Sequence, residues 1–278
     1  MSFDVVYKFL AWDDYEPESN KIITERKIKM SNSKSWGADY PEWKLPFDWD
    51  SVSQEQIYEK VYERATIEVA MIGIEKLRVK DVTEHAENLM KKVKFWDEEN
   101  QISTERDFFE LLNSVTGAFC TTTNWDNSEM WEKWGHLGQG YCVGLNVKEL
   151  RKIDMLSGLC DLVNYYPPEN IPSISPISSN SIEAAINEFR IQLFSIPDRY
   201  SFEKEFRFTK INSNPDGTVT KPFTEEERIV DLPIKCYSSI TLGNSISDSD
   251  KNSIINSAKI SLPKIPIYSL AGGNRVLI

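Results

Sequence analysis

The sequence lacks the long apolar runs of a membrane-spanning protein. None of its 278 residues belongs to an uninterrupted apolar stretch of about 18 or more, the length that a spanning helix needs. The opening residues, MSFDVVYKFLAWDD, carry neither a basic leader nor a hydrophobic signal region followed by a cleavage site. These absences predict a cytoplasmic protein with no membrane partner.

Cysteine and histidine are also scarce. The four cysteines are scattered along the chain, and only His85 and His136 are present. A zinc site needs such ligands at short spacings, so we expect no metal site built from them. We expect free buried thiols in a reducing compartment instead, and a structural role for His136.

Glycine-rich phosphate signatures and a surplus of positive charge are missing as well. The segment GHLGQG at 135–140 lacks the strand-to-helix setting of a dinucleotide fingerprint and the Lys-Ser/Thr of a phosphate loop. The net charge of −11 disfavours wrapping duplex DNA on a broad basic surface. Rossmann and P-loop enzymes are therefore disfavoured, while a small local basic cleft is still compatible with the sequence.

What is present fits one large domain or two small ones, and we favour a single domain spanning residues 1–278. The chain is 40% hydrophobic and 12% aromatic, which is enough for a full-sized core. Apolar spacing predicts two amphipathic helices within 53–96 and a third at 105–115, so a helical insertion is expected at about 53–115. Strand patterns dominate the later part of the chain. This distribution predicts an α+β fold.

One segment, YSFEKEFRF at 200–208, alternates aromatic and charged residues. Successive side chains of a strand point to opposite faces, so Phe202, Phe206 and Phe208 would share one face. Glu203, Glu205 and Arg207 would share the other. Two interpretations are open for the charged face: a solvated sheet surface with cross-strand ion pairs, or a functional site.

Six short motifs in a fixed order carry a resemblance that covers nearly the whole chain. They are VYKFL, MSNS leading to LPFDWD, FCTTTNWDNSEMWEKWGHLGQGYCVGLN, VNYYP, YSFEKEFRF and SSITLG. In this order they resemble the bacterial domain-of-unknown-function family numbered 2971. The chain departs from that pattern at LPFDWD, and also where Lys133 and Trp134 replace the usual His and Tyr. The family name itself implies no reaction.

A more remote similarity, to ADP-ribosyltransferases, does imply a reaction. Tyr7 and Lys8 in a first strand, Ser31 in a second, and Glu203-x-Glu205 in a late strand follow the order of that family's NAD cleft. The similarity implies mixed or antiparallel sheets that form a split central core, with NAD as a substrate.

The same similarity implies roles for individual residues. Glu205 would stabilise the oxocarbenium-like centre that forms when the nicotinamide bond breaks, and Glu203 would position or deprotonate the attacking group. Arg207 would pair with the pyrophosphate or hold one glutamate in place. Tyr7 and Trp131 would stack on nicotinamide or adenine.

Each of these residues also has a structural interpretation. Trp131, like Trp134, suits a core anchor, and Tyr7 suits a core tyrosine with a bonded hydroxyl. Lys8 points away from Tyr7 on the same strand, so at most one of the two should line a cleft. Ser31 suits a turn.

Three classes of function follow from these patterns. The first is an NAD-consuming ADP-ribosyltransferase, such as a toxin or phage-defence effector, whose macromolecular target is a nucleic acid or a protein. This interpretation allows an antitoxin or chaperone as a further partner. The second is a nuclease or other hydrolase that uses Glu203, Glu205 and Asp48 with a divalent metal. The third is a non-catalytic binding module with aromatic interface residues.

Overall fold

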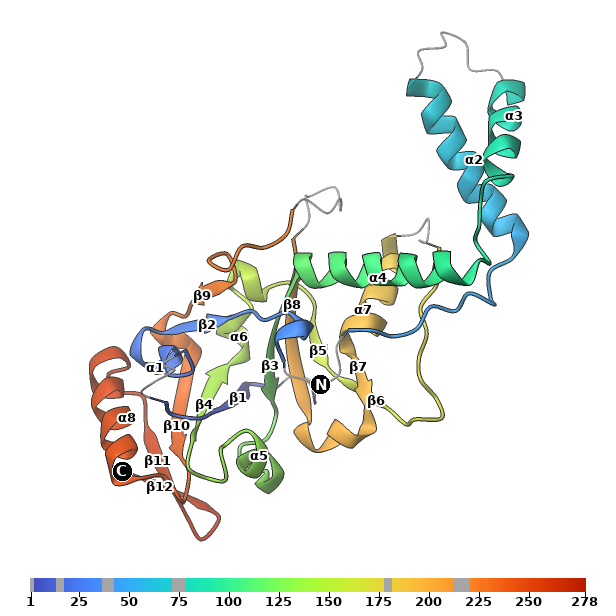
Figure 1. The fold of residues 1–278 in the computed structure, drawn as a ribbon. Coiled ribbons are helices and arrows are strands. Elements are labelled where there is room, and N and C mark those ends of the chain that lie inside the picture. Colours follow the sequence, from blue (N-terminus) through green and yellow to red (C-terminus); the bar gives the residue numbers. More distant parts are fainter. Residues whose placement is uncertain (1–2, 14–17, 37–42, 72–78, 178–181, 213–220) are drawn as a thin grey trace. The chain divides into compact units, whose positions relative to one another are not determined.

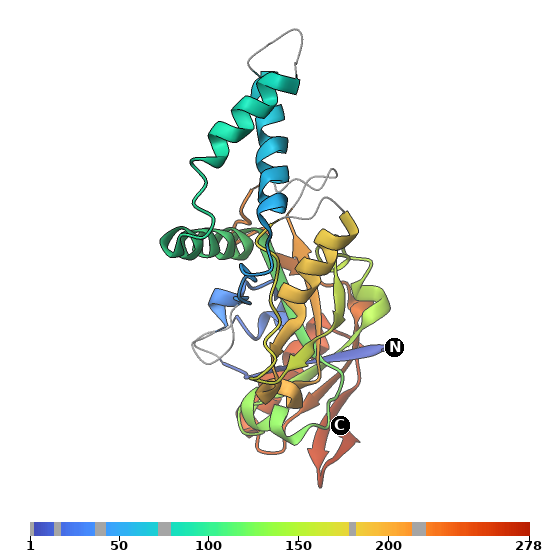
Figure 2. The ribbon, with the colours of Figure 1, turned by 90° about the vertical axis from the view of Figure 1, so that its right-hand side faces the viewer.

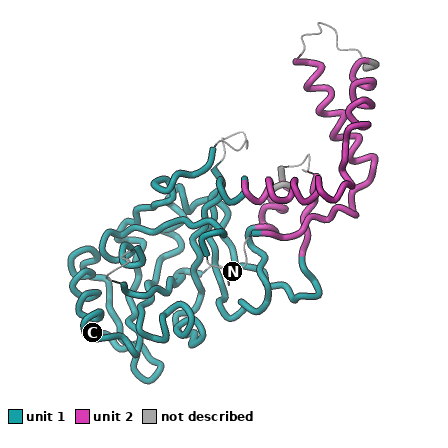
Figure 3. The backbone as a smooth tube through the Cα atoms, in the orientation of Figure 1, with its two compact units in different colours: residues 1–43, 111–171, 193–278 teal, residues 44–110, 172–192 magenta. Residues whose placement is uncertain are grey.

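The computed structural model describes residues 3–13, 18–36, 43–71, 79–177, 182–212 and 221–278. The chain divides into two compact units, which Figure 3 shows in different colours. Unit 1 comprises residues 1–43, 111–171 and 193–278, and unit 2 comprises residues 44–110 and 172–192. The division differs from the predicted single domain with an insertion at 53–115, because unit 2 begins earlier and includes a separate later segment.

The main sheet of unit 1 has eight strands in the described part of the chain, in the order β12–β11–β10–β4–β1–β3–β8–β5. The β10–β11 pair is parallel, and the other neighbours are antiparallel. Both views place β11 and β12 at one end of the sheet (Figure 1 and Figure 2). The α+β class predicted from the sequence is confirmed. The strands are β1 Val5–Leu10, β3 Thr116–Thr122, β4 Tyr141–Asn146, β5 Cys160–Leu162, β8 Glu205–Ile211, β10 Tyr237–Leu242, β11 Ile267–Ala271 and β12 Asn274–Leu277.

The main sheet is nearly divided between β1 and β3. Along its whole length, from Val5 to Leu10, β1 pairs with β4. Its pairing with β3 consists of a single position in the described structure, Tyr7 opposite Thr122. Since β3 then pairs along its length with β8, the sheet consists of two parts that separate beyond this one pair.

Short elements complete unit 1. Two small sheets accompany the main one, an antiparallel β2–β9 pair and a parallel β6–β7 pair. The elements are α1 Lys21–Thr24, β2 Lys27–Lys29, η1 Ser33–Ser35, α5 Ser128–Lys133, α6 Val147–Leu150, η2 Asp154–Leu156, β6 Asn164–Tyr166, β7 Ser195–Pro197, η3 Asp198–Glu203, β9 Ile229–Asp231, η4 Ile234–Cys236 and α8 Asp248–Ser261.

Helices cover both faces of the β1–β4 part of the sheet. Val6 and Val143 pack on one face in a large apolar cluster that includes Ile254 of α8. Phe9 and Cys142 point to the opposite face, where they join a cluster with residues of α5. The alternation of buried side chains along each strand therefore places α8 on one face and α5 on the other.

The helix α5 has an asparagine cap at its start, Asn127, and a tryptophan at its C-cap position, Trp134. The Asn127 side chain accepts hydrogen bonds from the backbone N–H groups of Glu129 and Met130, at 3.0 and 3.2 Å, which satisfies the first turn. The helix ends at Lys133, so Trp134 is the C-cap residue. The segment NSEMWEKWG at 127–135 thus contains a short helix that is capped by Asn127.

Unit 2 is largely helical. Its helices α2 (Gln54–Met71) and α3 (Val79–Met90) lie side by side in both views (Figure 2). Buried residues recur every four positions along α2, at 57, 61, 65 and 69, and they form one core with Val82 and Ala86 of α3. The helices α4 (Glu98–Val115) and α7 (Ile182–Phe194) extend across the boundaries between the units. Across the described ranges, every helix is too short or too polar to span a bilayer.

The strand predicted at 200–208 is wrong in its first half. Residues 198–203 form the 3-10 helix η3, Lys204 adopts a left-handed conformation with φ 44°, and β8 begins only at Glu205. Phe206 and Phe208 do share the large apolar cluster, but Phe202 packs in the cluster around α5. The left-handed residue ends the helix and redirects the chain into the strand. Periodicity does not reveal this reversal.

Candidate functional site

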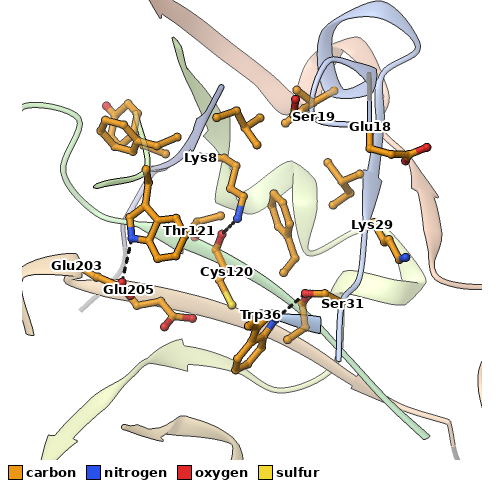
Figure 4. Close-up of a pocket in the computed structure, with 18 of the residues that line it drawn as sticks. Lys8, Glu18, Ser19, Lys29, Ser31, Trp36, Cys120, Thr121, Glu203 and Glu205 are labelled. Atoms are coloured by element: carbon orange, nitrogen blue, oxygen red, sulfur yellow. Dashed lines mark hydrogen bonds between the residues drawn. The ribbon is translucent and has the colours of Figure 1, made fainter. Parts of the chain in front are cut away.

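A cavity of about 380 Å³ lies where β1 and β3 separate (Figure 4). Beyond the Tyr7–Thr122 pair, residues 8–10 of β1 and 119–121 of β3 are not paired with each other, and they line the cavity. Residues of α1, β2, the segment 31–36, α5 and η3 also line it, as does Trp134. Small-molecule sites commonly measure about 300–1,000 Å³, so this cavity has the size of a ligand pocket.

Two glutamates line the cavity, one directly before and one directly after the left-handed residue Lys204. Glu203 is the last residue of η3, and Glu205 is the first residue of β8, where it lies opposite Thr122. Both line the cavity, and their exposed fractions are only 5% and 2%. The interpretation of these residues as a solvated sheet face is therefore wrong.

Glu205 is held by a buried arginine two residues along the strand. Arg207 donates from Nε to Glu205 Oε1 at 2.7 Å and from Nη2 to Oε2 at 2.8 Å. Its Nη1 donates to the Leu193 carbonyl. The guanidinium is fully buried, and such bidentate charge-assisted pairs are short and directional. The Glu205 carboxylate is consequently fixed in orientation at the edge of the cavity.

Glu203 has a different partner. The indole N–H of Trp134 donates to Glu203 Oε1 at 3.0 Å, and the Trp134 residue is 41% exposed. Figure 4 shows this bond at the side of the cavity next to Glu205. The two carboxylates therefore line one cavity with different restraints, one in a buried ion pair and one bonded to a partly exposed tryptophan.

A tyrosine fixes the backbone where β8 begins. The Glu205 N–H donates to the hydroxyl of Tyr165, in β6, at 2.8 Å. Burial raises the pKa of Tyr165 above its usual value, and the charge of Glu205 adds to this rise. The hydroxyl therefore stays neutral at physiological pH, and it remains available as an acceptor for the Glu205 N–H.

Lys8 places a cation in the same cavity. Its Nζ donates to the Cys120 carbonyl at 3.0 Å, across the gap between β1 and β3, and it lies 5.6 Å from the centroid of the Phe119 ring. No carboxylate of the described residues lies within ion-pair distance of it. A partly buried ammonium without a counter-ion is suited to an anionic ligand such as a phosphate.

Ser31 lines the cavity beside Trp36. Its hydroxyl accepts a hydrogen bond from the Trp36 indole N–H at 2.7 Å, and its backbone pairs with Ala118 of β3. Trp36 also lines the cavity, and its ring lies 4.9 Å from the Arg207 guanidinium carbon. Ser31 thus forms a β-bridge with Ala118 and holds the Trp36 ring at the cavity, so it is more than a turn residue.

Three predicted site residues are placed differently from the expectation. Trp131 lies outside this cavity, because its ring packs edge-on against Phe9 at 4.8 Å as a core anchor. Arg207 is sealed behind Glu205 and does not line the cavity, so of its two predicted roles only holding a glutamate fits this geometry. Tyr7 and Lys8 both line the cavity, so the expectation that at most one of them would do so is wrong. The Tyr7 ring packs in the cluster around α5 and lies 5.2 Å from the guanidinium carbon of Arg275.

The structure also brings in residues that the sequence reasoning did not select. Trp36, Cys120 and Trp134 all line the cavity. The sequence favours a core position for Trp134, but the residue is 41% exposed at the cavity. Trp134 is the C-cap residue of α5, and it keeps a helical conformation with its N–H bonded to the Met130 carbonyl. Its indole reaches Glu203, whereas the indole of Trp131 packs in the core.

Cys120 is predicted to be an unreactive thiol. Burial raises its pKa far above the usual range, and the charge of Glu205 raises it further. Because the thiolate is the reactive form, iodoacetamide at pH 8 should alkylate Cys120 in the native protein at least about tenfold more slowly than in the urea-unfolded chain. Peptide mass spectrometry over time measures both rates. Equal rates would contradict the predicted protonation state.

The described residues offer no ligand set for the hydrolase interpretation. Within the ranges given above, no group of three His, Cys, Asp or Glu side chains is placed to hold a metal ion.

The combination that the structure does show is a carboxylate pair, a lysine and two tryptophans around one cavity. Such a set can bind an anionic, aromatic ligand and stabilise positive charge that develops on it. The family resemblance and the ADP-ribosyltransferase similarity remain predictions from the sequence. Comparisons with family models, with curated proteins and with solved structures found no match to this chain.

Proposed function

We propose that the protein is an NAD-consuming ADP-ribosyltransferase that modifies a macromolecular target, a nucleic acid or a protein. The observation that carries the proposal is the cavity between β1 and β3, in which the buried carboxylate of Glu205 and the ammonium of Lys8 line one space. A carboxylate suits the ribose end of NAD and a lysine suits its pyrophosphate. The cavity is also lined by residues of both β1 and β2, as a transferase cleft of this kind requires.

The chemistry assigns a separate task to each glutamate. As the bond between ribose C1′ and nicotinamide breaks, nicotinamide leaves with the bonding electron pair and positive charge develops on the ribose. A fixed carboxylate beside that centre stabilises the charge, which is the task of Glu205. An acceptor group of the target then bonds to C1′, and Glu203 takes the acceptor's proton.

Label transfer tests this proposal directly. The protein is incubated with NAD radiolabelled in its adenylate phosphate and with a cell lysate, in the presence and absence of a chelator. We expect label to appear on nucleic acid or protein in both conditions. The absence of NAD binding and of label transfer in every condition would contradict the proposal, and transfer abolished by the chelator would favour the metal-dependent alternative.

Lys8→Gln is expected to weaken NAD binding by about tenfold or more, because a hydrogen bond to a charged group contributes about 1.5–3 kcal/mol. Titration calorimetry measures the dissociation constant. Lys148→Gln provides the matched control, since Lys148 is exposed on α6 and does not line the cavity. Equal affinities of the Lys8→Gln variant and the unmodified protein for NAD would show that Lys8 does not contribute to NAD binding.

A further inference from the structure

Trp36 lies between the cavity and the buried arginine. It lines the cavity, and its ring centroid lies 4.9 Å from the central carbon of the Arg207 guanidinium. Arginine favours this stacked arrangement because the planar cation is attracted to an aromatic face. The ring therefore covers the guanidinium group that holds Glu205.

The indole itself is fixed to β3. Its N–H donates to the Ser31 hydroxyl at 2.7 Å. Ser31 is joined to Ala118 by two backbone hydrogen bonds, of 2.9 and 2.7 Å. Trp43 packs edge-on against the Trp36 ring, with centroids 5.1 Å apart and planes at 83°. Trp36 is thus held by the strand that forms one side of the cavity.

Arg207 connects this ring to the carboxylate. The guanidinium N–H groups donate to both oxygens of Glu205 and to the Leu193 carbonyl, and the guanidinium carbon lies over the Trp36 ring, 4.9 Å from its centroid. Rotation of the guanidinium would break the two parallel bonds to Glu205. A contact that fixes the plane of the guanidinium therefore also fixes the plane of the carboxylate.

We propose that Trp36 is a positioning residue that holds the Glu205 carboxylate in its reacting orientation through Arg207. The proposal rests on the transferase function proposed above. Ser31 acts one step further away, by fixing the indole. Without the ring, the guanidinium face is open to water or to the bound ligand, and the carboxylate is free to tilt away from the ribose.

The test compares kcat and KM for nicotinamide release from NAD in Trp36 variants. Trp36→Leu removes the ring and fills part of its volume, and we expect kcat to fall about 10- to 100-fold, as for a displaced catalytic group. We expect KM to change by less than about threefold, because a residue that orients the carboxylate without contacting NAD affects kcat and leaves substrate binding unchanged. Trp36→Phe keeps a ring over Arg207, so its kcat should stay within about fivefold of the unmodified protein.

A second pair of variants shows whether Trp36 acts through Arg207. Lysine has no planar face to stack, so in the Arg207→Lys background we expect Trp36→Leu to change kcat by less than about twofold. An equal fall in kcat in both backgrounds would overturn the proposal. A rise in KM with kcat unchanged would also overturn it, because Trp36 would then be a ligand contact.

The outcomes separate this proposal from the transferase function. If the unmodified protein releases no nicotinamide, the proposed function fails and the role of Trp36 fails with it. If the unmodified protein is active and Trp36→Leu matches it in kcat, only the positioning role fails.

Thermal unfolding shows whether each variant is folded. If Trp36→Leu does not fold, Ser31→Ala replaces it in the test, because this variant removes the hydroxyl that accepts the hydrogen bond of the Trp36 indole. For Ser31→Ala, a reduced kcat with KM unchanged supports the role, and an unchanged kcat contradicts it.

Discussion

Glu205→Gln is expected to lower the rate of nicotinamide release from NAD by about 100- to 1,000-fold, the effect of removing one electrostatic stabiliser from a preorganised site. The amide keeps the shape of the side chain and removes its negative charge. Glu205 lies at the cavity with an exposed fraction of 2% and both of its oxygens bonded to Arg207, so the charge sits at a fixed place. Steady-state release of nicotinamide, followed by chromatography, measures the loss.

The same substitution also affects stability, and the experiment has to separate the two effects. Removing one partner of a buried ion pair costs about 3–5 kcal/mol, because the other charge stays buried and unpaired. Arg207→Gln is the matched control, since it breaks the same pair and leaves the carboxylate at the cavity. We expect similar losses of unfolding free energy in the two variants, and a smaller loss of activity in Arg207→Gln. Equal activity of Glu205→Gln and the unmodified protein would contradict the assigned role.

Arg228→Met is expected to lower the free energy of unfolding by about 3 kcal/mol or more, since each buried carbonyl left without a partner costs about 1–3 kcal/mol. Arg228 has an exposed fraction of 2%. Its Nη1 donates to the carbonyls of Thr116 and Met30, at 2.8 and 3.3 Å. Its Nη2 donates to Asn113 and Ser114 at the end of α4, at 3.1 and 3.0 Å. The arginine therefore joins the end of a helix to the start of β3.

Urea denaturation followed by circular dichroism measures this loss. Lys221→Gln is the matched control. It removes a nearby cation of the same chain, whose exposed ammonium forms an ion pair with Glu227 at 2.6 Å. Exposed ion pairs contribute little to stability, so the control should unfold almost as the unmodified protein does. An Arg228→Met variant as stable as the control would show that these carbonyls find other partners.

The alternation of residues 205–209 was sufficient to predict part of the site. Phe206 and Phe208 fill the core, and Glu205 and Arg207 lie together on the other side of the strand, as a period of two requires. The same periodicity misplaces Phe202, and it assigns Glu203 to the strand, although Glu203 is the last residue of η3 and lines the cavity from there. A single left-handed residue, Lys204, separates a 3-10 helix from the strand, and no alternation pattern encodes that local reversal.

The cavity itself could not be predicted from local patterns. It exists because β1 pairs fully with β4 and at one position with β3, which depends on contacts between segments more than a hundred residues apart in sequence. The role of Trp36 depends on the same distant contacts, since its ring covers an arginine that lies far along the chain. Periodicity identifies which residues share a face, but only the pairing of strands decides which faces enclose a space.

The most direct measurement is a crystal structure with an NAD analogue that has carbon in place of the oxygen of the nicotinamide ribose ring. This analogue cannot form the oxocarbenium-like centre, so it stays intact in the site. The predicted result is an analogue bound between β1 and β3, with its nicotinamide ribose hydrogen-bonded to Glu205 and its pyrophosphate in contact with Lys8. An analogue bound elsewhere on the protein, or an empty cavity at saturating analogue, would contradict the proposed function.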